Sequence, residues 1–141
     1  MKALLLLRHA KSSWDEPGLR EIDRPLTGRG RKAAARMGRL LAERGLIPDL
    51  IVCSPARRAR ETYDALAPAL DADPELRFED GLYLAEPAGL LRLTQALPDT
   101  ARTVLLIGHN PGLERFAGRL AGSAAGDSLR RMAAKFPTAA L

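Results

Sequence analysis

The sequence predicts an α/β fold, a three-layer sandwich in which a mostly parallel central sheet carries helices on both faces. Short apolar runs of strand length alternate along the chain with longer segments that have the hydrophobic spacing of amphipathic helices. This alternation favours a parallel sheet, because each helix returns the chain to the end of the sheet where the next strand begins. The 141 residues are enough for one domain, which we expect to span residues 1–141.

Four apolar runs are the expected strands: residues 3–7 (ALLLL), 50–53 (LIVC), 76–78 (LRF) and 103–108 (TVLLIG). The run at 76–78 is the weakest of them. Cys53 ends the second run, and its apolar neighbours favour a small core residue over a catalytic thiol. Because it is the only cysteine, no disulfide can form within the chain.

Four longer segments are the expected helices: residues 30–45, 55–70, 86–97 and 111–122. We expect Thr27 to cap the first helix and Gly45 to end it. Ser54 is the expected cap of the second helix, with Pro55 at its first position. Apolar residues at helical spacing mark the expected buried faces: Ala33, Met37, Leu40 and Leu41 in the first helix, Ala59, Tyr63, Leu66 and Leu70 in the second, and Leu113, Phe116 and Leu120 in the last.

The two ends of the chain give further expectations. Residues 3–7 are too few to span a membrane, and they lead into Arg8 and His9 instead of a signal-peptide cleavage site, so we expect a cytoplasmic protein without membrane contact. Residues 121–127 (AGSAAGD) are predicted to form a loop. The final PTAAL resembles the start of a strand, so the domain is expected to lack its last C-terminal strand.

The charge balance is basic, with a net charge of +5 and an isoelectric point near 10.0. A basic charge favours the binding of nucleic acids or of anionic substrates. Here the arginines are spread along the chain, and aromatic residues, which stack on bases, make up only 4%. We therefore expect no nucleic-acid partner and interpret most arginines as surface residues.

Both histidines of the chain directly follow expected strands. Arg8 and His9 come after the first strand, His109 comes after the last, and the second strand leads into a helix start that carries Arg57 and Arg58. The carboxyl ends of parallel strands line one edge of a sheet, so these side chains should meet there. Arginine forks and a helix N-terminus suit phosphate, and neutral imidazole is a nucleophile towards phosphorus. Without a phosphate-binding glycine loop or a metal-ligand motif, the pattern predicts a phosphate site that uses no metal or cofactor.

Four motifs follow one another along the chain: RHA after the first strand, then DRPLTGRGRKAA, SPARRARET and GHNPG. Together they resemble the histidine phosphatase superfamily. The stretch RHAKSSW, with Ala10 at the third position of the Arg-His-Gly (RHG) signature, resembles the small SixA-type phosphohistidine phosphatases. The resemblance covers nearly the whole chain and implies a phosphoglycerate-mutase-like fold.

The resemblance also assigns roles to the four residues at the strand ends. His9 matches the nucleophile that becomes phosphorylated, and Arg8 matches the first phosphate-binding arginine. Arg58 matches the second such arginine, and His109 matches the histidine that stabilises the transition state.

Three further residues are candidates for substrate binding. Ser12 lies just beyond His9 and has a hydroxyl that suits phosphate. Arg24 is expected near the mouth of the pocket, and Asn110 matches the turn that presents the second histidine. We expect Trp14 to pack over the loop that follows His9.

The general acid is where the sequence departs from larger family members, which place an acidic residue after the third strand. Here that region reads LRFEDGLYLAEP, and the candidates are Glu79, Asp80 and Glu86. An alkoxide leaving group needs a proton, whereas a phosphohistidine that is protonated on its other ring nitrogen leaves as neutral imidazole. A weak acid site therefore favours a P–N substrate.

Three functions stay open from the sequence. The first is a metal-independent phosphatase that acts on phosphohistidine in a partner protein, such as a phosphorelay domain. The second is the same chemistry on a small phosphoester. The third is a non-catalytic module that binds anions or nucleic acid, which the set of two histidines and two arginines disfavours, because an anion binder needs no nucleophile.

Overall fold

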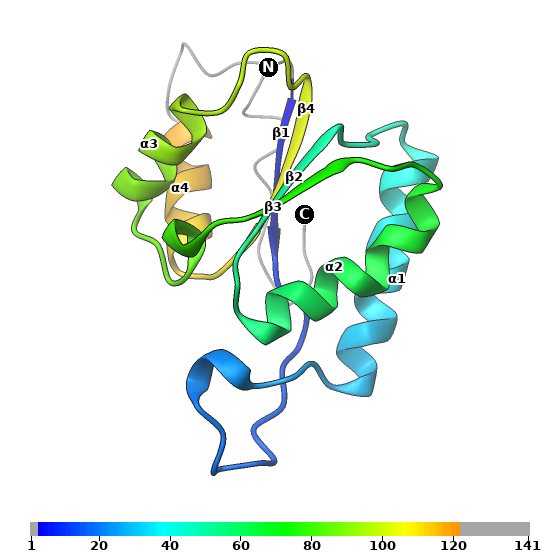
Figure 1. The fold of residues 1–141 in the computed structure, drawn as a ribbon, viewed down its shortest axis with the longest axis vertical. Coiled ribbons are helices and arrows are strands. Elements are labelled where there is room, and N and C mark those ends of the chain that lie inside the picture. Colours follow the sequence, from blue (N-terminus) through cyan, green and yellow to red (C-terminus); the bar gives the residue numbers. More distant parts are fainter. Residues whose placement is uncertain (1–2, 122–141) are drawn as a thin grey trace.

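A computed structural model describes residues 3–121, in which strands and helices alternate (Figure 1). The strands are β1 (Ala3–Arg8), β2 (Leu50–Cys53), β3 (Glu75–Phe78) and β4 (Thr103–Gly108). The helices are α1 (Gly28–Glu43), α2 (Arg57–Leu70), α3 (Pro87–Gln95) and α4 (Gly112–Ala121), with two short 3-10 helices, η1 (Glu21–Asp23) and η2 (Asp80–Leu82). The four strands and four helices predicted for this part of the chain are all present, with ends that differ by no more than two residues.

The strands form one sheet in the order β1-β4-β2-β3, and every strand pair is parallel. In the register of the sheet, Leu105 of β4 lies opposite Leu5 of β1 on one side and Ile51 of β2 on the other. The prediction of a parallel sheet is confirmed. Because β1, β4 and β2 are neighbours, the segments that follow their carboxyl ends start from adjacent positions on the same edge.

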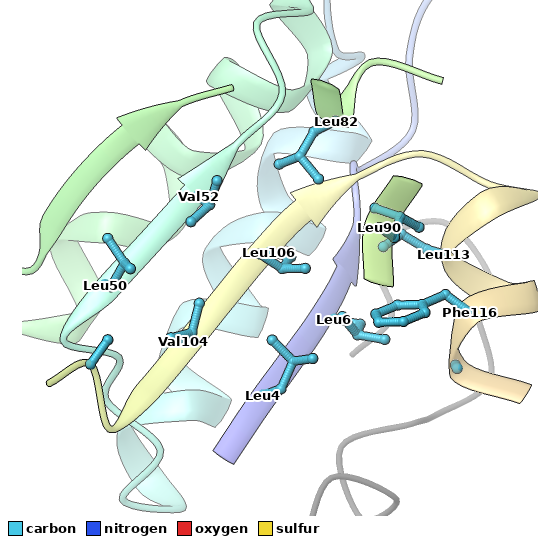
Figure 2. Close-up of a cluster of buried hydrophobic side chains, with 12 residues drawn as sticks. Leu4, Leu6, Leu50, Val52, Leu82, Leu90, Val104, Leu106, Leu113 and Phe116 are labelled. Atoms are coloured by element: carbon cyan, nitrogen blue, oxygen red, sulfur yellow. The ribbon is translucent and has the colours of Figure 1, made fainter. Parts of the chain in front are cut away.

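Helices cover both faces of the sheet, with α3 and α4 on one side and α1 and α2 on the other (Figure 1). Successive strand residues point to opposite faces, so each face has its own core. The first core joins the strands to α3 and α4 (Figure 2) and includes Leu4, Leu6, Leu50, Val52, Leu90, Val104, Leu106, Leu113 and Phe116. The second joins them to α1 and α2 and includes Leu5, Leu7, Leu41, Ile51, Cys53, Leu66, Leu105 and Ile107.

Cys53 is a core residue, as predicted. Its side chain is fully buried, and this burial raises the pKa of the thiol to about 12. A thiol with such a pKa carries almost no thiolate near neutral pH and is a poor nucleophile.

Both predicted ends of α1 are confirmed. The hydroxyl of Thr27 accepts a hydrogen bond from the Gly30 amide at 2.9 Å. Gly45 has a φ of +67°, which favours glycine. The amide of Leu46 donates to the Leu41 carbonyl at 2.9 Å, so that the C-terminus ends in a Schellman motif.

The buried face of α1 differs from the prediction. It consists of Gly30, Ala34, Gly38 and Leu41. Leu41 was predicted correctly, and Ala33, Met37 and Leu40 are partly buried. Of these three, Ala33 and Met37 pack against core residues. The cause of the difference is a close approach between α1 and α2, where a Cβ on Gly38 would lie 2.3 Å from the Leu66 carbonyl oxygen. An apolar pattern does not reveal glycines that are buried for this reason.

The predicted start of α2 is wrong. The helix begins at Arg57, after Ala56, and no side-chain hydrogen bond caps it. The hydroxyl of Ser54 accepts from the Ala56 amide at 3.3 Å, just before the helix, and it also lies 2.7 Å from Nε2 of His109. The predicted buried face of α2 is confirmed for Ala59, Leu66 and Leu70, whereas Tyr63 is only partly buried.

In α4, Leu113 and Phe116 are buried as predicted, whereas Leu120 is partly buried. The predicted C-terminal strand and all of the predicted loop after Ala121 lie outside the described residues. Within residues 3–121, no helix has the length and apolar character needed to cross a membrane.

Candidate active site

The carboxyl ends of β1 and β4 place the two histidines side by side. Arg8, the last residue of β1, is paired with Gly108 of β4, so His9 and His109 follow at equivalent positions. The His9 amide also donates to the Gly108 carbonyl at 3.0 Å, which continues the strand pairing by one residue. The two imidazole ring centroids are 5.3 Å apart, and both histidines are buried.

Arg58 connects the two histidines. It enters from the first turn of α2 and is only 2% exposed. Its Nε donates to Nε2 of His9 at 3.2 Å, and its Nη2 lies 3.2 Å from Nδ1 of His109. Three of the four residues predicted to form the site are therefore in direct contact. The fourth, Arg8, ends β1 beside them, and its charge acts on both histidines.

The tautomer of His9 follows from its partners. Nδ1 lies 2.7 Å from the Ala10 carbonyl oxygen, which can only accept, so Nδ1 carries the proton. Nε2 then has a lone pair, in agreement with the hydrogen bond that it accepts from Arg58. His9 thus points an unprotonated nitrogen at a guanidinium, so a phosphoryl group held by that arginine would lie beside a potential nucleophile.

The tautomer of His109 is the opposite one. Nδ1 faces the donor Nη2 of Arg58 and must accept, so the proton is on Nε2. This N–H donates to the Ser54 hydroxyl at 2.7 Å. Ser54 follows β2, and its amide bonds to the Ile107 carbonyl of β4 at 2.9 Å, so the partner of His109 also comes from a strand end.

Both imidazoles are held neutral. Burial lowers the pKa of His9 from 6.5 to about 4, and the charges of Arg58, Arg8 and Arg24 act in the same direction, while the bond to the Ala10 carbonyl opposes them. Burial and the charge of Arg58 lower the pKa of His109 to about 3. A desolvated imidazole surrounded by guanidinium groups disfavours the proton, as a nucleophile at neutral pH requires.

Thr62 of α2 joins the residue after the nucleophile to the helix that carries Arg58. The Thr62 hydroxyl accepts from the Ala10 amide at 2.9 Å and donates to the Arg58 carbonyl at 2.7 Å. Thr62 is fully buried, so water cannot replace either bond. One side chain therefore links the residue after His9 to the arginine that contacts it.

Glu21 contacts the other side of Arg58 and was not predicted. Its Oε1 lies 2.7 Å from Nη2 of Arg58, and its backbone carbonyl accepts from Nη1 at 3.0 Å. Tyr83 donates its hydroxyl hydrogen bond to the same carboxylate, and its ring meets that of His109 edge-on at 5.4 Å. Partial burial alone would raise the pKa of Glu21, but the Tyr83 hydrogen bond and the charges of Arg58 and Arg24 lower it overall.

The loop between β1 and α1 holds Arg24, Ser12 and Trp14, and it extends beyond the carboxyl end of β1 (Figure 1). Arg24 donates to the Ser12 hydroxyl at 2.9 Å, and its guanidinium carbon lies 3.4 Å from the ring centroid of Trp14. Trp14 thus packs within the loop as predicted, although it is 74% exposed. Nη2 of Arg24 also lies 3.4 Å from Oε1 of Glu21, so the same carboxylate contacts both Arg24 and Arg58.

Asn110 has a structural task in addition to its position beside His109. Its side-chain oxygen accepts from the Glu114 amide at 3.2 Å, at the start of α4. Gly112 makes the close packing of this turn possible, because a Cβ there would lie 1.9 Å from the Ala85 carbonyl oxygen.

The three carboxylates considered as general acids do not reach the histidines. Glu79, Asp80 and Glu86 are exposed, and among residues 3–121 none of their side chains makes a hydrogen bond or an ion pair. Glu21 is the carboxylate that the fold brings to the site. It belongs to the short helix η1, where exposed polar residues carry no periodic pattern, so only its closeness to Arg24 in the sequence pointed to this region.

Comparison with known proteins agrees with this geometry. The family model for the histidine phosphatase superfamily (branch 1) matches residues 4–83. An uncharacterized chloroplast protein of Arabidopsis thaliana is 35% identical over 132 residues, and the match covers 86% of this chain and 60% of that protein. An uncharacterized protein of Mycobacterium tuberculosis is 32% identical, with 96% and 84% covered.

Two solved structures extend the comparison. A protein from Agrobacterium tumefaciens, provisionally named phosphohistidine phosphatase SixA, is 34% identical with a TM-score of 0.82, and the match covers 96% of this chain and 86% of that one. A protein histidine phosphatase SixA complexed with tungstate is 21% identical with a TM-score of 0.80, covers 96% and 83%, and shares the fold. The chain belongs to the histidine phosphatase superfamily and is of the SixA type within it.

Proposed function

We propose that this phosphatase hydrolyses phosphohistidine on a partner protein through a phosphorylated His9. The observation that carries the proposal is the tautomer of His9. Its Nδ1 is bound to a carbonyl, and its Nε2 is unprotonated and accepts a hydrogen bond from Arg58. Each nitrogen therefore has a fixed role before a phosphoryl group arrives, which lowers the reorganisation needed for attack.

In the first step, Nε2 of His9 forms a bond to phosphorus while the bond between phosphorus and the substrate nitrogen breaks. The electron pair of that bond stays on the substrate imidazole, which leaves neutral when its other nitrogen carries a proton. Arg8 and Arg58 balance the charge of the phosphoryl oxygens without a metal ion. In the second step, water attacks phosphorus, and His9 leaves with the electron pair to give inorganic phosphate.

His109 completes the phosphoryl site. Its pKa is low when Arg58 is its main charged neighbour. A phosphoryl dianion would place negative charge beside the ring and raise this pKa, so that protonation of Nδ1 becomes more favourable and the ring can donate a hydrogen bond to a phosphoryl oxygen. Ser54 keeps the Nε2 proton in place before that happens.

The arrangement of acids supports a P–N substrate. Glu21, which pairs with Arg58 and whose charge acts on His109, has a lowered pKa and is ionised at neutral pH, so it does not supply a proton to an alkoxide. The exposed carboxylates after β3 do not contact the histidines. Neutral imidazole is the leaving group that needs no donor.

Turnover of a phosphohistidine-bearing protein, compared with p-nitrophenyl phosphate and sugar phosphates in the presence of EDTA, tests the proposal. We expect the phosphohistidine protein to give the highest kcat/KM and EDTA to have no effect. High activity on sugar phosphates with none on phosphohistidine would instead identify a small-molecule phosphatase. Phosphate binding without turnover of any of them would identify an anion-binding module. A cytoplasmic location stays a prediction.

A further inference from the structure

Arg58, the arginine that would bind phosphate, already has an anionic partner within the protein. Nη2 forms an ion pair with Oε1 of Glu21, 2.7 Å away, and it also lies 3.2 Å from Nδ1 of His109, to which it can donate. Nε is directed at His9. A phosphoryl group that approaches His9 must therefore take over contacts that Arg58 makes with other residues.

We propose that Glu21 is an internal anion that competes with the phosphoryl group for Nη2 of Arg58. The inference rests on the proposed function only in that Arg58 binds the phosphoryl group, and it holds for a P–N or a P–O substrate. Glu21 acts through Arg58 and is a positioning residue in this account.

Burial explains why Arg58 needs a permanent counter-charge. A guanidinium that is 2% exposed has lost almost all of its hydration, and an unpaired charge in such a place is strongly destabilising. Among the ion pairs of residues 3–121, Glu21 is the carboxylate that contacts Arg58. Glu21 and the phosphoryl group would supply the same negative charge in turn, so that Arg58 remains compensated throughout the reaction.

The two partners differ in how easily they move. Arg58 lies in a regular helix, and its Nη1 is also bound to the Glu21 backbone carbonyl. The Glu21 side chain is 42% exposed and belongs to a 3-10 helix of three residues. It can turn towards water at little cost, while Tyr83 and Arg24 keep it within reach. We therefore assign the movement to the carboxylate and not to the arginine.

Competition has two consequences for the reaction. Anions that bind Arg58 weakly are excluded, because they must displace a carboxylate that is already in contact. Inorganic phosphate, the product, is released more readily, because Glu21 can take its place on the buried guanidinium. Both consequences are differences in binding equilibria and need no change in the chemical step.

Calorimetric titration with inorganic phosphate provides the test, on the wild-type chain, on Glu21→Gln and on Asp23→Asn. The first variant removes the competing charge with little change in shape, so we expect its phosphate Kd to fall about three- to tenfold. Asp23→Asn is the matched control, because Asp23 lies in the same 3-10 helix, loses the same charge and pairs with Arg20 at 2.7 Å. Its phosphate Kd should not change.

The outcomes separate this inference from the proposed function. If the wild-type protein binds no phosphate, the assignment of the phosphatase site is wrong. If phosphate binds but Glu21→Gln binds it equally well or more weakly, Glu21 merely holds Arg58 in place and the competition is refuted. An equal gain in Asp23→Asn would reduce the effect to net charge and refute it as well.

A measurement on the wild-type chain makes the test independent of any folding defect in the variant. The carboxyl carbon of Glu21 can be titrated by NMR with and without saturating inorganic phosphate. Displacement from Arg58 removes a contact that stabilises the carboxylate and adds a nearby negative charge, so the pKa of Glu21 should rise when phosphate binds. An unchanged or lower pKa would contradict the competition.

Discussion

Substitution of Ser54 by alanine tests how the second histidine is controlled. In the structure the Ser54 hydroxyl accepts a hydrogen bond from Nε2–H of His109 at 2.7 Å, and Ser54 is fully buried. Without the hydroxyl, the buried N–H of His109 loses its acceptor, and the Ala56 amide loses a weaker bond of 3.3 Å. If the proton moved to Nδ1, it would face Nη2 of Arg58, which is also a donor, at 3.2 Å. Neither tautomer is then satisfied.

A buried donor that has lost its partner costs about 1–3 kcal/mol, and this is the expected loss in the free energy of unfolding of Ser54→Ala. If about 1.4–2.7 kcal/mol of this interaction orients His109 in the transition state, kcat/KM falls roughly 10- to 100-fold. The assays are urea unfolding and turnover of p-nitrophenyl phosphate or of a phosphohistidine protein. Ser13→Ala is the matched control, because its hydroxyl accepts only an exposed local bond from the Asp15 amide. A Ser54→Ala protein with unchanged stability and kcat/KM would refute the tautomer assignment.

Three further predictions concern charge and packing. His9 and His109 have pKa values of about 4 and 3 in the folded chain and about 6.5 in the unfolded chain, so only the unfolded chain gains these protons as the pH falls from 6.5 towards 4. In urea titrations the free energy of unfolding should therefore fall by about 1.4 kcal/mol per pH unit for each of the two histidines. A flat pH profile would contradict the lowered pKa values. Gly38→Ala should lower the melting temperature, because its Cβ would lie 2.3 Å from a backbone oxygen of α2, whereas Gly118→Ala, with open space around the Cβ, should be neutral or stabilising by about 0.5–1 kcal/mol; equal effects in calorimetric melts would argue against the close helix contact. Arg58→Lys keeps the charge but cannot donate to both histidines and Glu21 as a planar fork, so kcat/KM should fall by about 10² or more, and a near-normal value would show that charge alone suffices.

The strands and the catalytic set could be predicted from the sequence because each rests on a strong local pattern. Apolar runs such as residues 3–7 end in hydrophilic residues, and a parallel sheet brings such ends together. His9 and His109 are therefore placed by topology alone. Arg58 needed the family motif, since Arg57 beside it fits the composition equally well but lies partly exposed and pairs with Glu61.

The residues that escaped prediction act through contacts between distant segments. Glu21 pairs with Arg58 and accepts a hydrogen bond from Tyr83, and no sequence pattern around either residue predicts these contacts. Ser54 has the pattern of a helix cap, but it lies two residues too early to cap α2, and its hydroxyl also bonds to His109, which follows β4. Gly38 looks like a weak point in a helix until the partner helix is in place. Each of these needs the tertiary fold to be known.

The most direct test of the account is to identify the residue that carries the phosphoryl group during turnover. Enzyme mixed with a phosphohistidine protein, quenched in alkali to preserve P–N bonds and analysed by mass spectrometry, should carry phosphate on His9, and His9→Gln should be inactive and unlabelled. Phosphate on another residue, or full turnover by His9→Gln, would contradict the assignment of His9 as the nucleophile.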